Sequence, residues 1–540
     1  MINKMVRIPA ILTMMILSAS VAFADGLIEI ARMTVADDRV EDVTISVNGT
    51  AGGTISINGV KQVIENIKET KTFKVDVSSN KTIVIESESA SNLIGMNCTN
   101  SSLTSLDVSG CDALRSLFCI NNLLTSLDIS GCNALVNLLC DDNLLTSLDV
   151  SSCDALENLS CNDNSITSLD VSGLTALLVL SCNDNSLTSL NVSGCDALKY
   201  LFCSNNSLTS LDISGLSTLL NLSCYDNLLT SLDVSGCDAL QILSCGNNSL
   251  TSLNVSGIST LNRISCSNNS LTSLDVSNCD ALMDLYCNNN LLTSLDASGC
   301  AALFRVSCDN NSLASLNLSG CDALENISCQ NNSLENLYVS GFGSLKILYC
   351  NNNLLTSLDV SACDVLVDLR CYDNSLVSLN ISGCDALLEL YCHSNYLTSL
   401  DVSGCNYLQT LSCFNNLLTS LDVSDCGALN YLFCANNLLT SLDVSGCEAL
   451  NYLFCSHNLL TSLDISGCTT LHYLYAESQD AAVSVPSDYN RTDVDIFFNG
   501  EPHAFPIDGE FFINFPENIP NKSHFSGTVS IVRYKGKKGK

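Results

Sequence analysis

The thirty-two cysteines of this 540-residue chain are the residues whose spacing most needs a chemical explanation. Eighteen recur every 21 residues from Cys98 to Cys455, and fourteen form a second series from Cys111 to Cys468. Thiols in such numbers could form disulfides, bind a metal or an iron–sulfur cluster, or serve as small apolar side chains. The chain has no CxxC pair and only five histidines, which argues against a metal or cluster site.

The second cysteine series favours a packing role. Four of its positions hold apolar residues instead, and these are Leu174, Leu216, Ile258 and Phe342. A cysteine that alternates with Leu, Ile or Phe behaves as a small buried hydrophobe. We therefore expect buried thiols without disulfide bonds. Disulfides between adjacent coils are the alternative, although side chains in direct register fit the required dihedral poorly.

Aspartates form a third ladder, which runs from Asp107 to Asp464. Asparagine interrupts it at 191, 254, 317 and 380. Carboxylates stacked at strand spacing repel one another, so we expect them to bind cations or to titrate with raised pKa values. A solvated acidic ridge is favoured over a calcium site, because the sequence offers no convergent loop of oxygen ligands.

Motifs for catalysis do not occur in the chain. There is no GxSxG elbow, HExxH helix or P-loop, and His393, His457 and His472 stand without triad partners. We expect no enzymatic activity, no catalytic residue, no cofactor and no metal.

The cysteines belong to a repeat, LxxLxCxxNxLTSLDVSGC, that dictates the elements around them. In one copy Leu117 and Cys119 alternate as the inward residues of a short strand, with Phe118 outward. Asn122 recurs in every copy, and its amide can bond to backbone groups of its own and neighbouring coils. The second half places Leu127 and Ile129 inward, and 21 residues leave no room for a helix. The period predicts an all-β coil in which one strand per coil joins a parallel sheet.

The first half of the repeat resembles the leucine-rich-repeat core LxxLxLxxNxL, with cysteine in place of the third leucine. The nested pattern resembles bacterial IRREKO-type repeats, and the LTSLDVS phrase resembles internalin-like, cysteine-ladder proteins of bacterial surfaces. The resemblance covers residues 98–475. It implies a mainly β leucine-rich-repeat solenoid of about eighteen 21-residue coils. The chain departs from many internalins because it lacks a wall-sorting motif such as LPxTG.

The outward positions around each strand vary, whereas the core and turn positions barely change. We expect this strand face to bind a ligand, since exposed aromatic and arginine side chains are typical of binding hot spots and sugar-stacking platforms. The candidate ligand-binding residues are Tyr349, Arg370, Tyr372, Tyr391, His393, Phe414, Tyr431, Phe433, Tyr452 and Phe454. Packing of a C-terminal cap over Tyr473 and Tyr475 is one alternative, and aromatic packing that only stabilises the sheet is another.

The flanks of the repeats suggest export and capping. Residues 1–24 have the layout of a secretory signal peptide, residues 25–97 alternate as the strands of an N-terminal β cap, and residues 476–540 suggest a C-terminal β cap or tail domain with a basic end. No stretch after residue 24 is long and apolar enough to span a membrane. The formal charge of −34 argues against a nucleic-acid partner.

These features predict an exported protein, extracellular or on the cell surface, with the periplasm as a further possibility. The predicted function is binding or adhesion, in which the variable strand face recognises a protein or glycan ligand on a host or other cell surface. The alternative is a structural spacer or a self-associating cell-surface component.

Overall fold

The computed structural model describes residues 31–36, 42–48, 54–57, 60–63, 70–77, 81–87, 93–109, 111–461, 463–465, 467–476 and 495–497. It divides into two compact units, Met1–Leu282 and Met283–Lys540. The predicted signal peptide and nearly all of the predicted tail lie outside the described residues. Within the described part, no helix is long and apolar enough to cross a membrane.

Antiparallel strands open the first unit, in the region predicted to form a cap. One sheet has the order β4-β3-β6-β1-β8, and its strands are β1 (Ala31–Val35), β3 (Thr54–Ile57), β4 (Val60–Val63), β6 (Thr82–Ser87) and β8 (Leu103–Asp107). β2 (Val43–Asn48) pairs antiparallel with β5 (Thr70–Val75) and β7 (Gly95–Asn97). β7 in turn pairs in parallel with the first coil strand, so it joins the antiparallel strands to the coils.

The coils of the first unit each contribute one three-residue strand to the main sheet, in parallel and in register. These strands are β9 (Ser116–Phe118), β10 (Asn137–Leu139), β11 (Asn158–Ser160), β13 (Val179–Ser181), β15 (Tyr200–Phe202), β16 (Asn221–Ser223), β17 (Ile242–Ser244) and β18 (Arg263–Ser265). Each residue pairs with the residue 21 positions later, as Leu117 does with Leu138. The register follows from the repeat length, since a shift of one residue would turn the buried leucines outward.

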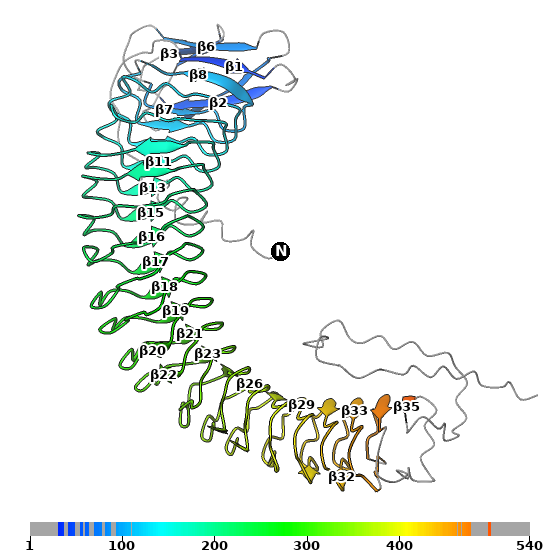
Figure 1. Ribbon diagram of the computed structural model, residues 1–540. Helices are drawn as coiled ribbons and strands as arrows, with labels where there is room; N and C mark the ends of the chain where they lie inside the picture. Colours follow the sequence, from blue (N-terminus) through cyan, green and yellow to red (C-terminus); the bar gives the residue numbers. More distant parts are fainter. Residues whose placement is uncertain are drawn as a thin grey trace, which may run out of the picture. The chain divides into compact units, whose positions relative to one another are not determined.

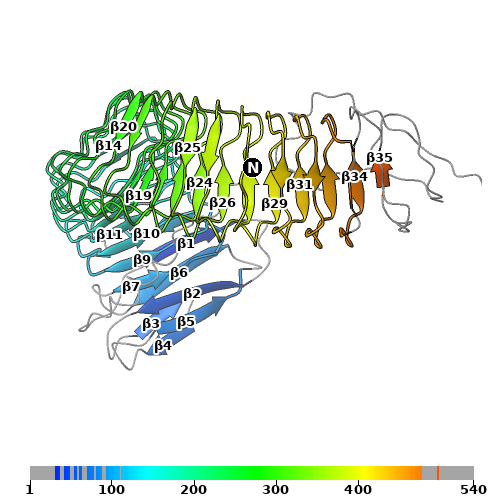
Figure 2. The same ribbon diagram turned by 90° about the horizontal axis from the view of Figure 1, so that it is seen from below.

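The second unit continues the same pattern (Figure 1). Its strands are β19 (Asp284–Tyr286), β21 (Arg305–Ser307), β23 (Asn326–Ser328), β24 (Ile347–Tyr349), β26 (Asp368–Arg370), β28 (Glu389–Tyr391), β29 (Thr410–Ser412), β31 (Tyr431–Phe433), β33 (Tyr452–Phe454) and β34 (Tyr473–Tyr475). Figure 2 shows β24, β26, β29, β31 and β34 side by side. β35 (Asp495–Phe497) pairs in parallel with β34 and so extends the sheet past the last repeat.

The second half of the coil is extended but forms strands only in places. The pairs are β12 (Ser168–Asp170) with β14 (Ser189–Asn191), β20 (Ser294–Asp296) with β22 (Ser315–Asn317), β25 (Ser357–Asp359) with β27 (Ser378–Asn380), and β30 (Leu421–Asp422) with β32 (Leu442–Asp443). In the second unit these pairs lie across the coil from the main sheet (Figure 1). The described residues contain no helix, so the predicted all-β solenoid is confirmed.

The core is the interior of each coil. In the coil that begins at β31, Leu432, Cys434, Leu439 and Val444 have no exposed surface. All thirty-two cysteines lie in the described residues, carry thiols rather than disulfides, and are buried except for the half-buried Cys111. The expectation that they act as small core residues is confirmed by this burial.

Thiols of the second series also donate weak hydrogen bonds. The Sγ of Cys363 lies 3.4 Å from the carbonyl oxygen of Val339, and the Sγ of Cys384 lies 3.3 Å from that of Val360. Each acceptor is a carbonyl of the preceding coil that also accepts a turn N–H, from Phe342 for Val339 and from Cys363 for Val360. Cysteine at this position therefore adds a weak donor that leucine lacks while filling a similar apolar site.

An asparagine amide links three coil segments at every turn. Asn437 Nδ2 donates to the carbonyl oxygens of Cys413 at 3.0 Å and Cys434 at 3.1 Å, and its Oδ1 accepts from the backbone N–H of Leu418 at 3.0 Å. The residue before it, Asn436, has a φ of 54°, a left-handed conformation that Asn and Asp tolerate. The predicted asparagine ladder is confirmed.

The amide of Asn437 should be required for stability. Asn437→Ala removes the acceptor of the buried Leu418 N–H and one of the two amide donors to each of the Cys413 and Cys434 carbonyls. We therefore expect the free energy of unfolding to fall by about 2 kcal/mol. Urea unfolding followed by circular dichroism measures the change. Thr419→Ala, on an exposed position of the same coils, is the control and should change stability by less than about 0.5 kcal/mol. Equal effects of the two variants would contradict the role of the ladder.

The thiols should be protected from reagents in the folded protein. Burial raises the pKa of Cys98 to about 12, and burial with the nearby charges of Asp107 and Asp112 raises that of Cys111 to about 11. With Ellman's reagent at mildly alkaline pH, we expect slow reaction of the native protein, beginning at Cys111, and thirty-two thiols after unfolding. A low count after unfolding without reductant would show that disulfides form instead.

Candidate functional site

Three columns of outward side chains cross the strands β24 to β34 of the second unit. The central column holds the last residue of each strand: Tyr349, Arg370, Tyr391, Ser412, Phe433, Phe454 and Tyr475. The leading column holds the first residue: Ile347, Asp368, Glu389, Thr410, Tyr431, Tyr452 and Tyr473. The trailing column follows each ladder cysteine: Asn351, Tyr372, His393, Phe414, Ala435 and Ser456. Parallel pairing in register places equivalent residues side by side.

Aromatic rings stack along the leading and central columns at β31, β33 and β34. The ring centroids of Tyr431 and Tyr452 are 4.9 Å apart, and those of Tyr452 and Tyr473 are 4.6 Å apart. In the central column, Phe454 lies 5.1 Å from Phe433 and 4.4 Å from Tyr475. These separations follow the strand spacing of about 4.8 Å. Each ring therefore turns its face toward the neighbouring coil and its edge away from the sheet.

A shorter stack occupies the trailing column. The His393 ring lies 4.5 Å from Tyr372 and 4.3 Å from Phe414, with interplanar angles of 8° and 11°. His393 Nδ1 is also 3.1 Å from the hydroxyl of Ser412 in the central column. The hydrogen bond and the two stacking contacts together fix the orientation of the imidazole.

Arg370 lies between two tyrosine rings of the central column. Its guanidinium carbon is 4.5 Å from the ring centroid of Tyr349 and 5.2 Å from that of Tyr391, which is within cation–π range. The guanidinium donates to both carboxylate oxygens of Asp368, with the shortest distance at 2.9 Å. Its Nη2 is 3.7 Å from Glu389. The contacts with two ring faces and the paired hydrogen bonds to one carboxylate together fix the orientation of the guanidinium.

Burial and neighbouring charges set the protonation of this cluster. Burial, followed by the hydrogen bond and charge of Asp368, raises the pKa of Tyr349 to about 12. Burial and the charge of Glu389 raise the pKa of Tyr391 as well. Although burial opposes the charge of Arg370, its bonds to Asp368 raise its pKa. The tyrosines therefore stay neutral hydrogen-bond donors and the arginine stays charged at physiological pH.

All ten residues predicted from the sequence lie in these columns, with partly exposed side chains. The structure places them in three groups. The first is Tyr349, Arg370 and Tyr391, the second is Tyr372, His393 and Phe414, and the third is Tyr431, Phe433, Tyr452 and Phe454. Tyr473 and Tyr475 continue the third group, and β35 pairs with their strand.

Sequence reasoning missed an apolar stripe at the turn after the strands. Tyr396 is 55% exposed, Leu417 and Leu438 are each 42% exposed, and Leu459 is partly exposed. They occupy the same position of four successive coils. The sequence does show this difference, since other coils have serine at the same repeat position, as at Ser333. Large apolar residues at an exposed, variable position therefore extend the candidate surface beyond the three columns.

The aspartate ridge behaves differently from the sequence-based expectation. Asp401 Oδ1 accepts a 2.9 Å hydrogen bond from the backbone N–H of Ser403, and hydrogen bonds from the side chain and backbone of Ser403 lower its pKa. Asn380 Oδ1 accepts the same bonds from Ser382. The expectation of raised pKa values was therefore wrong for the ladder members with resolved shifts: Asp128, Asp149, Asp170, Asp212, Asp233, Asp296, Asp359, Asp401 and Asp422.

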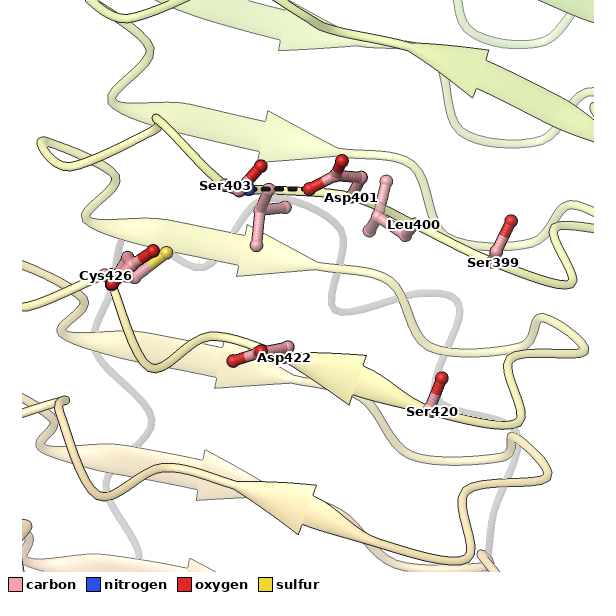
Figure 3. Close-up of a pocket in the computed structure, with 9 residues that line it drawn as sticks. Ser399, Leu400, Asp401, Ser403, Ser420, Asp422 and Cys426 are labelled. Atoms are coloured by element: carbon pink, nitrogen blue, oxygen red, sulfur yellow. Dashed lines mark hydrogen bonds between the residues drawn. The ribbon is translucent and has the colours of Figure 1, made fainter.

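A depression of about 180 Å³ lies on this ridge (Figure 3). Its lining includes Asp401, Ser403, Asp422, Asp425 and Cys426. Most of these residues belong to the repeated LTSLDVSxC phrase, so other coils present similar side chains. Among the described residues, no group of three or more His, Cys, Asp or Glu side chains is arranged to hold a metal ion. Apart from Asp425, which stands where most coils have glycine, these lining residues are supplied by the repeat.

Known proteins share this repeat and this fold. A family profile described as leucine-rich repeat matches residues 99–115, 267–284 and 393–410. The functional domain of InlJ from Listeria monocytogenes, whose structure includes a cysteine ladder, is 30% identical over 72% of this chain and 73% of that chain, with a TM-score of 0.45. A comparison with curated protein sequences gave no match.

Two further solved structures support the fold alone. YopM from Yersinia enterocolitica WA-314 is 20% identical, with 75% of this chain and 91% of that chain covered and a TM-score of 0.51. The plant peptide hormone receptor RGFR1, solved in complex with RGF2, is 20% identical, with coverage of 70% and 72% and a TM-score of 0.50.

The lowered pKa values of the ridge predict an acid-sensitive contribution to stability. This contribution is present when the pH is above the carboxyl pKa of the unfolded protein, about 3.9. It is lost as the pH falls through the lower carboxyl pKa values of the folded protein. In Asp401→Asn/Asp422→Asn the amides keep the serine bonds without titrating. We therefore expect a slightly lower melting temperature at neutral pH, where the contribution of the ionised carboxylates is lost, and a smaller fall between about pH 4 and pH 3. Asp425→Asn is the control, because Asp425 lies outside the Asp–x–Ser turn. Its melting temperature should fall over this pH range as that of the unmodified protein does.

Proposed function

The chain belongs to the bacterial leucine-rich-repeat proteins with internalin-like cysteine-ladder repeats, and from this premise we propose that it is an exported binding or adhesion protein. Its ligand is a protein or glycan, and the contact surface is the strand face of the second unit. No catalytic step is part of this function.

The proposal rests on which positions of the repeat differ from coil to coil. In coils with nearly invariant leucines, cysteines and asparagines, the large outward residues gather in the three columns between β24 and β34. Their side chains are partly exposed, already ordered by stacking and cation–π contacts, and therefore lose little further entropy on binding. Preordered aromatic and arginine side chains are the usual energetic centres of protein interfaces.

Export and surface location rest on the predicted signal peptide of residues 1–24 and on the family. The RGFR1 structure contains a bound RGF2. By analogy we propose that this chain also uses its coil surface for a ligand. The apolar stripe of Tyr396, Leu417, Leu438 and Leu459 would add contact area at the edge of that surface.

The test removes aromatic side chains from the strand face. Tyr391→Ala/Tyr431→Ala/Phe433→Ala should lose binding by at least roughly tenfold, because truncated central hot spots usually cost 1–2 kcal/mol or more each. Binding is measured with the purified mature protein on a glycan array and on a panel of extracellular proteins.

The matched control removes two tyrosines elsewhere in the second unit. Tyr338 and Tyr407 are 81% and 65% exposed and lie outside the three columns. Tyr338→Ala/Tyr407→Ala should bind as the unmodified protein does. Equal binding by both variants would place the ligand elsewhere. Absence of any hit, together with concentration-dependent self-association, would instead support a structural or self-associating surface component.

A further inference from the structure

The ring stacks of the strand face constrain the kind of ligand that can bind there. Sugars contact aromatic residues by lying flat on a ring face. In the columns the ring faces are turned against neighbouring rings, as in Tyr452 between Tyr431 and Tyr473 and in His393 between Tyr372 and Phe414. Within these stacks the surface therefore presents ring edges and hydroxyl groups, which suit the side chains of a polypeptide better than the face of a sugar.

The central column is broken at one coil. From β24 to β34 its side chains are planar at every position except Ser412, which lies in register between Tyr391 and Phe433. Arg370 covers one side of Tyr391, and Phe454 packs against one side of Phe433. Among the described residues, no ring or guanidinium stands between Tyr391 and Phe433. The buried Ser412 forms the floor at this break.

The chain itself shows which group fits between two such rings. Two coils earlier, Arg370 is inserted between Tyr349 and Tyr391 at centroid distances of 4.5 Å and 5.2 Å. A guanidinium above Ser412 would have the equivalent arrangement, with Tyr391 on one side and Phe433 on the other. The strands that carry the two rings are separated by one intervening strand in both cases.

Charge at the break favours a cation. Glu389 is adjacent in register to Thr410, the leading-column residue of the Ser412 coil. The carboxylate of Asp368 is largely buried and is used by Arg370 and Tyr349. The Glu389 side chain is 42% exposed, lies 3.7 Å from Arg370, and accepts a 3.2 Å hydrogen bond from Tyr391. It retains acceptor capacity toward an incoming donor.

We propose that the break at Ser412 receives an arginine side chain of a polypeptide partner, whose guanidinium completes the stack between Tyr391 and Phe433 and bonds to Glu389. The inference rests on the proposed function, which it narrows from protein or glycan to polypeptide. Lysine would be a poor substitute, because its ammonium is not planar and cannot stack between two rings. The overall charge of −34 would also steer a basic segment toward the chain.

The experiment selects ligands from a random peptide library displayed on phage, with the mature chain immobilised. We expect the selected peptides to share an arginine, and we expect its replacement by lysine to weaken binding by roughly tenfold. Ser412→Tyr fills the break with a ring of the chain's own, which extends the stack and should abolish binding while circular dichroism and the melting temperature show an intact fold.

Ser328→Tyr is the matched control, since it makes the same substitution at the same position of a coil next to Tyr349. Its binding should be unchanged. Glu389→Gln should weaken the binding of the arginine-containing peptides by several-fold. Peptides that bind without an arginine requirement, or that bind Ser412→Tyr as well as the unmodified protein, would overturn the inference and leave the proposed function intact.

A glycan array run with the same proteins separates the remaining outcomes. Glycan binding through the columns without any peptide binding would refute the arginine proposal alone. No binding to peptides, extracellular proteins or glycans would refute both this proposal and the proposed function.

Discussion

Each coil depends on the side-chain amide of one asparagine, because the turn after the strand leaves backbone groups that the parallel sheet cannot use. Asn437 illustrates the solution, with two donated bonds to carbonyls of adjacent coils and one accepted bond from a third segment. An amide supplies both donors and an acceptor at one point, which neither aspartate nor leucine can do. The turn is thereby fixed, and the 21-residue register of the strands follows from it.

Because the register is fixed, the residues at one variable position of the repeat lie side by side in a column across successive coils. Within the second unit, residues 21 apart lie at the strand spacing, so the choice of residue in one coil acts directly on the next. Tyr452 stacks between two rings because Tyr431 and Tyr473 occupy the same position of the adjacent coils. Arg370 lies between two rings because Tyr349 and Tyr391 do the same on either side of it. The core residues and the candidate site are therefore two consequences of one repeat, in which inward positions are uniform and outward positions around the strands are individual.

The same logic explains why the thiols and carboxylates are structural. Burial keeps ladder thiols such as Cys98 neutral, while the ridge aspartates close turns with the serine two residues later, a task that asparagine performs equally well at 380. Repeated chemistry of this kind cannot distinguish one coil from another. The function we propose therefore uses positions where coils differ, and the largest such side chains of the second unit gather around the strands.

The sequence by itself determined the coil, because period, leucine alternation and the asparagine ladder are local patterns that admit one register. It also located the ten strand-face residues, since variation against a uniform repeat is visible without coordinates. It misjudged the aspartates, because repulsion between stacked carboxylates is apparent from spacing whereas the bond from Ser403 to Asp401 depends on the turn conformation. Only the tertiary structure decided that the rings stack face to face, that Arg370 lies between two of them, and that Ser412 breaks the column. Ring orientation and guanidinium placement depend on side-chain torsions set by neighbours 21 residues away, and the repeat pattern does not encode them.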